Sequence, residues 1–129
     1  MNPTAEERDA LFKAFGRAFF RQDLDAMYQV VTEDFTYSIL VNDQPRIMTT
    51  RDQVAAFFEE RKGIQQVVRF EDVVYHHAPD ATVMTYRVTG TDVASGVPFE
   101  RVGVERYTFR DGRIAEKDVY SRPTLHAAA

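Results

Sequence analysis

Two stretches of alternating apolar and polar residues, 97–110 and 113–123, lie on either side of Asp111-Gly112. Alternation with a period of two is typical of β-strands that bury one face. An Asp-Gly pair between two such stretches favours a tight turn. The pattern therefore predicts a β-hairpin that turns at Asp111-Gly112, and most of the candidate chemistry of the chain lies on it.

The N-terminal half has apolar residues at helical spacing instead. Thr4, with Glu7 three residues later, forms a capping-box pattern before a long amphipathic stretch with an aromatic stripe. Asp23 can cap a second, shorter helix. Thr50 with Gln53 forms another capping-box pattern. We therefore predict three helices, of which the first two form a helical hairpin.

The remaining stretches are rich in β-branched and aromatic residues. A strand is predicted from about residue 34 to 40, closed by a turn at 42–45, and two further strands are predicted at 65–77 and 81–93. Helices followed by a run of antiparallel strands indicate an α+β fold with the helices packed on one face of the sheet. No linker or repeat divides the chain, so we expect one domain over residues 1–129 with an ordered core at about 4–123.

Composition and charge limit the classes of partner. The chain has 129 residues, a net charge of -4 and no block of basic residues, which argues against nucleic acid as a partner. It contains no cysteine, which fits a reducing compartment. The sequence shows neither the apolar core of a signal peptide nor a membrane-spanning run. We therefore expect a cytoplasmic protein with no membrane partner.

Motifs for cofactors and metals are equally scarce. Gly-rich phosphate loops and a serine nucleophile elbow are absent from the sequence. His76 and His77 would need further ligands to hold a metal, and the third histidine is His126, near the C-terminus. We therefore expect no cofactor and no metal.

Three short motifs point to a family: Gln22-Asp23-Leu24-Asp25, Glu33-Asp34-Phe35 and Phe109-Arg110-Asp111-Gly112-Arg113-Ile114. Together with the order of the elements, they resemble the nuclear transport factor 2-like superfamily, and within it the SnoaL-like branch of small bacterial proteins. The resemblance implies a curved antiparallel or mixed sheet wrapped into a cone around three helices, an α+β barrel with a deep apolar pocket. It also implies a small apolar or aromatic ligand and a homodimer formed through the outer sheet face.

The reaction does not follow from this fold. Members of the superfamily include polyketide cyclases, ketosteroid isomerase, scytalone dehydratase, limonene epoxide hydrolase and binding modules. The places of the ketosteroid isomerase tyrosine, base aspartate and donor aspartic acid hold Phe15, Ile39 and Glu105 in this chain. Arg122 stands where the cyclase and epoxide hydrolase branches usually have an aspartate. Glu105 is therefore the carboxyl group on which acid/base chemistry would depend.

The register of the predicted hairpin decides which residue faces Glu105. A two-residue type I′ turn at Asp111-Gly112 places Asp118 opposite Glu105. A bulge at Gly112 instead shifts the pairing by one residue, and Lys117 then faces Glu105. The first register is favoured because it buries Ile114 and Tyr120 and leaves an apolar patch outside for a dimer. That outer patch consists of Val102, Val104 and Val119.

In the favoured register, Glu105 and Asp118 are a catalytic pair of carboxylates in an apolar cavity, where burial and like charge raise at least one pKa towards neutrality. Arg101 or Tyr37 would polarise a substrate carbonyl. In the structural alternative, Glu105 and Arg101 form an ion pair along one strand. The predicted ligand-binding residues are Phe15, Phe19, Tyr37, Ile39, Phe58, Tyr86, Arg101, Tyr107 and Tyr120.

Two functions remain open at this point. The first is a cofactor-free acid/base enzyme of the cyclase, isomerase or dehydratase kind, which acts on an enolisable carbonyl compound with Glu105 and Asp118 as proton carriers. The second is a non-catalytic ligand-binding or dimeric interaction module of the same fold. A perturbed pKa of Glu105 favours the first function, and a solvated Glu105 paired with Arg101 or Lys117 favours the second.

Overall fold

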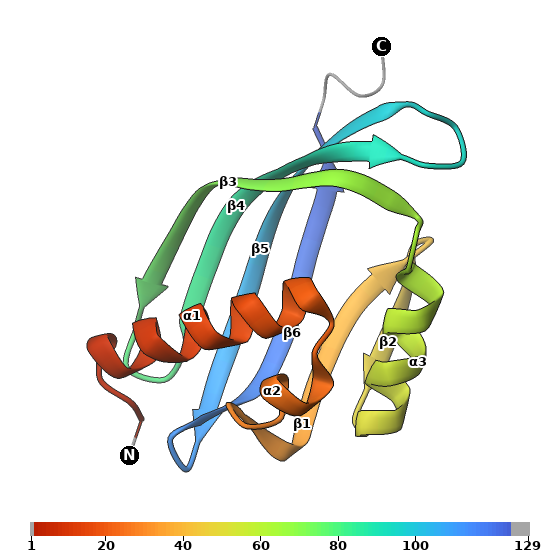
Figure 1. Ribbon diagram of the computed structural model, residues 1–129. Coiled ribbons are helices and arrows are strands. Elements are labelled where there is room, and N and C mark those ends of the chain that lie inside the picture. The colour runs from red at the N-terminus through yellow and green to blue at the C-terminus, as the bar shows by residue number, and fades with distance from the viewer. Residues whose placement is uncertain (1, 125–129) are drawn as a thin grey trace.

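The structure, a computed structural model, describes residues 2–124. His126, the third histidine, lies outside the described residues. Three helices and six strands follow one another in the order shown in Figure 1. They are α1 (Ala5–Arg21), α2 (Leu24–Met27), β1 (Val31–Val41), β2 (Gln44–Met48), α3 (Arg51–Arg61), β3 (Gln65–His77), β4 (Thr82–Asp92), β5 (Pro98–Arg110) and β6 (Arg113–Pro123).

The six strands form one mixed sheet in the order β2-β1-β6-β5-β4-β3. Strands β1 and β6 run parallel, and every other neighbouring pair is antiparallel. Figure 1 shows a curved sheet with α1 lying across its concave side and α3 beside β2. The predicted α+β class and curved sheet are confirmed, but the sheet is open and does not close into a barrel.

The helix starts follow the local sequence signals. Thr4 accepts a hydrogen bond from the backbone of Glu7, whose side chain accepts one from the backbone of Thr4, so the predicted capping box begins α1. The same reciprocal pair is made by Thr50 and Gln53 at the start of α3. Asp23 caps α2, which is only four residues long. No helix of the described residues has the length and apolar character needed to cross a membrane.

Strand β2 was missed by the sequence analysis. Asn42 and Asp43 both have positive φ angles, as a two-residue type I′ turn requires, and the chain then pairs back onto β1. Pro45 lies in β2, which pairs with β1 alone and forms an edge of the sheet. An edge strand tolerates proline because one side of its backbone has no ladder to complete.

The curvature of the sheet comes partly from β3. The pairing of β3 with β4 shifts between Gln66 and Arg69 and again between Glu71 and Val74. Val67 and Asp72, which lie inside these two intervals, have positive φ angles. Such bulges bend a strand and increase its twist, and Figure 1 shows β3 arching over the concave side. The arch leaves room between the sheet and the helices.

The β5–β6 hairpin follows the favoured register only next to its turn, and beyond that it follows neither of the two registers considered above. Asp111 and Gly112 have positive φ angles and Phe109 pairs with Ile114, as the type I′ turn predicts. The pairing then shifts by one residue at Ala115. From there Lys117 pairs with Tyr107, and Val119 pairs with Glu105. The favoured register is therefore wrong beyond Ala115, because a bulge reverses which side chains of β6 face the concave side.

Candidate functional site

A cavity of about 760 Å³ lies on the concave side of the sheet. The predicted ligand-binding residues that line it are Phe15, Phe19, Tyr37, Ile39, Phe58, Tyr86, Arg101 and Tyr107. Glu105 and Lys117 line the cavity as well. Ligand binding by these residues stays a prediction, but the fold brings them together around one space of the size that small-molecule sites usually have.

Glu105 is the only carboxylate in the described residues that is buried within the core, with 4% of its surface exposed. The hydroxyl of Tyr107, on the same strand, donates a hydrogen bond to Glu105 Oε1. Lys117 Nζ lies 3.5 Å from the same oxygen, and the two side chains of this ion pair are 5% and 6% exposed. The cavity therefore contains a buried ion pair of opposite charges rather than two carboxylates.

The ammonium group of Lys117 is surrounded by aromatic rings. Its Nζ lies 3.6 Å from the ring centroid of Phe19, 5.0 Å from that of Tyr37 and 5.2 Å from that of Phe15. Burial lowers the pKa of Lys117, and the negative charge and hydrogen bonding of Glu105 oppose that shift. The ring faces also favour the charged amine. Glu105 and the rings thus favour the charged form of Lys117 against the effect of burial.

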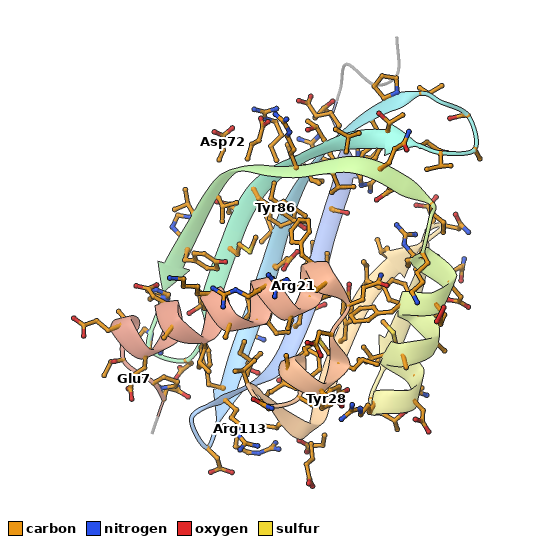
Figure 2. All side chains as sticks on the ribbon, viewed as in Figure 1. Glu7, Arg21, Tyr28, Asp72, Tyr86 and Arg113 are labelled. Atoms are coloured by element: carbon orange, nitrogen blue, oxygen red, sulfur yellow. The ribbon has the colours of Figure 1, made fainter. Side chains whose placement is uncertain are left out.

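Tyr86 lies between Arg101 and Glu105 because the residue between them is a glycine. A Cβ atom at Gly103 would stand 2.2 Å from Tyr86 Cζ and 2.4 Å from its hydroxyl oxygen, so only glycine lets the ring lie this close to β5. Figure 2 shows Tyr86 on the concave side of the sheet and Asp72 on the opposite side. The phenol is consequently placed in the cavity, next to the carboxylate of Glu105.

The tyrosines of the cavity are strong candidates for hydrogen-bond donors. Burial, followed by the charge of Glu105, raises the pKa of Tyr37, and the same causes with a hydrogen bond to Glu105 raise that of Tyr107. Burial and Glu105 likewise raise the pKa of Tyr86, against a smaller lowering by Arg101. These phenols therefore keep their protons at neutral pH.

Two predicted site residues lie on the other face of the sheet. Asp118 pairs with Arg106 and accepts a hydrogen bond of 2.7 Å from the hydroxyl of Tyr120, which is 58% exposed. Neither lines the cavity. Their expected inward placement is wrong because the bulge at Ala115 shifts the alternation of β6. Asp118 and Glu105 therefore do not form the expected pair of facing carboxylates.

The bulge also changes the outer patch expected for a dimer. Val119 points into the cavity and is buried, whereas Val104 is exposed on the outer face opposite Tyr120. The patch of Val102, Val104 and Val119 therefore does not exist as expected. A homodimer through the outer face stays a prediction.

Arg101 does not pair with Glu105 as the structural alternative proposed. Its guanidinium donates hydrogen bonds to the side chain and the backbone carbonyl of Ser121 on β6. Lys117 takes the place of Arg101 as the cation beside Glu105. Lys117 was missed as a site residue. The less favoured register placed it opposite Glu105, whereas the structure pairs it with Tyr107 and brings only its ammonium group to Glu105.

Histidines and carboxylates do not gather elsewhere as a metal site. Within residues 2–124, no three side chains of His, Cys, Asp or Glu come together in a way that could hold a metal ion. His77 contacts Asp9 and Thr82, and His76 contacts Thr85.

Comparison with known proteins places this arrangement in a family. The family model of the SnoaL-like domain matches residues 12–117. The chain therefore belongs to the SnoaL-like domain family. No curated protein matches it.

Several solved structures share the fold at low sequence identity. An NTF2-like protein from Burkholderia xenovorans has 17% identity and a TM-score of 0.79, with 92% of each chain covered. A protein from Xanthomonas campestris that is provisionally named a polyketide cyclase has 22% identity and a TM-score of 0.71, with 89% of this chain and 90% of that chain covered. A protein with a ketosteroid isomerase-like fold from Catenulispora acidiphila, solved in complex with trimethylamine, has 17% identity and a TM-score of 0.68, with 85% of this chain and 83% of that chain covered. These likenesses show the NTF2-like fold.

Proposed function

We propose that the cavity binds a small, mostly apolar carbonyl compound and that Glu105 moves a proton on it in a cofactor-free reaction of the cyclase, isomerase or dehydratase kind. One observation carries this proposal: the carboxylate of Glu105 is buried in the cavity wall among tyrosines and an ammonium group. Carboxylates are rarely buried away from water without a role or a partner. The provisional naming of the Xanthomonas campestris relative as a polyketide cyclase is consistent with it.

The proton step needs a base and a group that stabilises the charge that forms. Tyr107 and Lys117 both contact Glu105 Oε1, which leaves Oε2 to accept the proton. As the proton leaves the α-carbon, the C–H electron pair forms the enolate C=C bond and the carbonyl π pair moves onto oxygen. The hydroxyl of Tyr86 or the ammonium of Lys117 then donates a hydrogen bond to that oxygen. Return of the proton from Glu105 to another carbon of a conjugated enolate completes an isomerisation. In a cyclisation, the enolate carbon attacks a second carbonyl, whose π pair moves onto oxygen, and Glu105 returns the proton to that alkoxide.

Tyr37 supplies a further donor. Within the described part of the chain its hydroxyl makes no hydrogen bond, although the side chain is almost fully buried. A phenol that stays protonated and unpartnered in a cavity can donate to a substrate oxygen. The proposal therefore gives Tyr37 the role of orienting the substrate rather than of moving the proton.

The non-catalytic alternative rests on the ion pair. Lys117 supplies the carboxylate of Glu105 with a counter-charge, as it would in a purely structural pair. However, Glu105 is buried, whereas the binding module was expected to have a solvated one. A protein that binds ketones without exchanging their protons would show that the alternative is correct.

Hydrogen–deuterium exchange at the α-carbon of enolisable aryl ketones tests the proposal directly. The probes are 2-acetonaphthone and 1-tetralone in deuterated buffer, followed by NMR, with wild type, Glu105→Gln and Asp118→Asn. Asp118 is the matched control because it is a carboxylate of the same hairpin on the opposite face.

We expect wild type and Asp118→Asn to accelerate exchange over buffer, and Glu105→Gln to lose roughly 100-fold or more of that acceleration. Equal exchange by wild type and Glu105→Gln would refute Glu105 as the proton carrier. Binding of the ketones by wild type without any acceleration would favour the binding module.

A further inference from the structure

Arg101 lies in the cavity apart from the Glu105–Lys117 pair. It stands four residues before Glu105 on β5, which corresponds to roughly 13 Å along an extended strand. Gly103 and the ring of Tyr86 lie between the two. The cavity therefore has one polar region at Glu105 and another at Arg101. The other polar residues that line it are Gln22, Asn42, Asp43, Arg61, Gln65, Asp92, Lys117 and Ser121 and the tyrosines.

The guanidinium of Arg101 has only neutral partners. Its Nε donates to Ser121 Oγ over 3.4 Å, and its Nη2 donates to the carbonyl oxygen and Oγ of Ser121 over 3.2 and 3.3 Å. In residues 2–124, no carboxylate forms an ion pair with Arg101, and its Nη1 makes no hydrogen bond. A guanidinium has five N–H donors, so the two on Nη1 are left for another partner.

Other arginines of the chain have their N–H groups satisfied in different ways. Arg8, which is 4% exposed, also forms no ion pair within residues 2–124, but its Nε, Nη1 and Nη2 all donate hydrogen bonds. Arg87, on the outer face, forms ion pairs with Glu71, Asp72 and Glu100. Arg61 also borders the cavity, but it is exposed to water. Arg101 is half-buried, so water solvates its charge only in part, and no carboxylate of residues 2–124 forms an ion pair with it. Unlike Arg8, Arg101 keeps a nitrogen, Nη1, that donates no hydrogen bond within residues 2–124 and that could meet a counter-charge from outside the chain.

We propose that Arg101 binds a carboxylate group of the ligand, so that the molecule taken up by the cavity is an apolar or aromatic keto acid. The proposal deepens the proposed function and rests on it for the position of the carbonyl. A guanidinium N–H forms a charge-assisted hydrogen bond with a carboxylate that is stronger than one with a neutral acceptor. Lys117 is less suited to this role because Glu105 already neutralises it. Tyr86, whose pKa responds to both Glu105 and Arg101, lies between the two regions and contacts the middle of such a ligand.

The test compares a keto acid with its neutral counterpart. The probes are 4-oxo-4-phenylbutanoate and 5-oxo-5-phenylpentanoate, each with its primary amide, and binding is measured by calorimetry at low and high salt. The variants are Arg101→Gln and Arg101→Lys. Arg106→Gln is the control, because Arg106 lies on the same strand but faces outwards. Circular dichroism checks that each variant is folded.

We expect wild type and Arg106→Gln to bind at least one acid roughly 10- to 100-fold more tightly than its amide. Arg101→Gln should lose this preference while it binds the amide as wild type does, and Arg101→Lys should retain part of it. Added salt should weaken the acid more than the amide.

Three results would overturn the proposal: equal affinity for acid and amide in wild type, an unchanged preference in Arg101→Gln, or no binding of either acid. Failure of the proposed function can be told apart from these results. Without proton transfer by Glu105, the acid preference would persist while neutral ketones exchange no protons. Without anion binding by Arg101, neutral ketones would still exchange their protons.

Discussion

Replacement of Glu105 by glutamine should strongly destabilise the protein, because it leaves the ammonium of Lys117 buried without a counter-charge. At the observed Nζ–Oε1 distance of 3.5 Å and an effective dielectric constant of about 20, the attraction between the two charges is roughly 5 kcal/mol. Removal of one partner of a buried ion pair typically costs about 3–5 kcal/mol. Both side chains are almost fully buried, so screening by water does not reduce this figure much. We expect a loss of about 3–5 kcal/mol at pH 7.

The pH dependence of this loss identifies Lys117 as its cause. Burial already lowers the pKa of Lys117 in the folded protein below that of the unfolded chain. Without Glu105, the group that opposes this shift is gone. Between the folded pKa and about 10.5, the unfolded chain then binds a proton that the folded chain lacks, so stability rises with pH. The Glu105→Gln variant should recover part of its stability as the pH rises from the folded pKa of Lys117 towards about 10.5.

Urea denaturation of four proteins measures both effects: wild type, Glu105→Gln, Lys117→Met and the double variant. The double variant should be more stable than Glu105→Gln, because replacement of a whole buried pair by neutral groups of similar size costs little. A loss below about 1 kcal/mol in Glu105→Gln, the range of exposed ion pairs, would refute the reasoning. Purely additive losses in the double variant would refute it too.

The protonated tyrosines and the glycine beneath Tyr86 give further predictions. Burial and Glu105 raise the pKa of Tyr37, Tyr86 and Tyr107, so absorbance at 295 nm should show that these tyrosines ionise only as the protein unfolds. The free energy of unfolding should therefore fall as the pH rises above about 10. Ionisation of all six tyrosines in the folded state near pH 10 would contradict this. Gly103→Ala should displace Tyr86 and cost about 1–3 kcal/mol in a melting experiment. Gly16→Ala places a Cβ atom in open space within α1, so it should instead stabilise the protein by about 0.5–1 kcal/mol. If Gly103→Ala were the more stable of the two variants, Tyr86 would not lie against Gly103.

Local signals in the sequence predicted the local structure well. The capping boxes at Thr4 and Thr50 and the turn at Asp111-Gly112 are confirmed, because each depends on residues within one turn of the chain. Strand β2 was missed because Pro45 was interpreted as part of a loop, and only its edge position makes it acceptable in a strand. The residues needed to recognise an edge lie far away in the sequence.

The candidate site was predicted in part. Glu105 and its aromatic surroundings were found from alternation on one strand, but the partner of Glu105 depended on a bulge at Ala115. A sequence clue was present: Ile114 and Val119 are five residues apart, so a regular strand can bury only one of them. The structure buries both, which requires one extra residue between them and brings Lys117 inward. The register of β6 is set by packing between residues far apart in the sequence, so alternation within one strand could not predict it.

A crystal structure of the protein with 4-oxo-4-phenylbutanoate would test the central claim most directly. The account predicts the phenyl ring among the aromatic walls of the cavity and the carboxylate on Arg101. It also predicts the α-carbon about 3–3.5 Å from the carboxylate of Glu105, the distance of a productive encounter, with the ketone oxygen hydrogen-bonded to Tyr86 or Lys117. A probe bound on the outer face near Tyr120, or bound in the cavity with its ketone turned away from Glu105, would contradict the account.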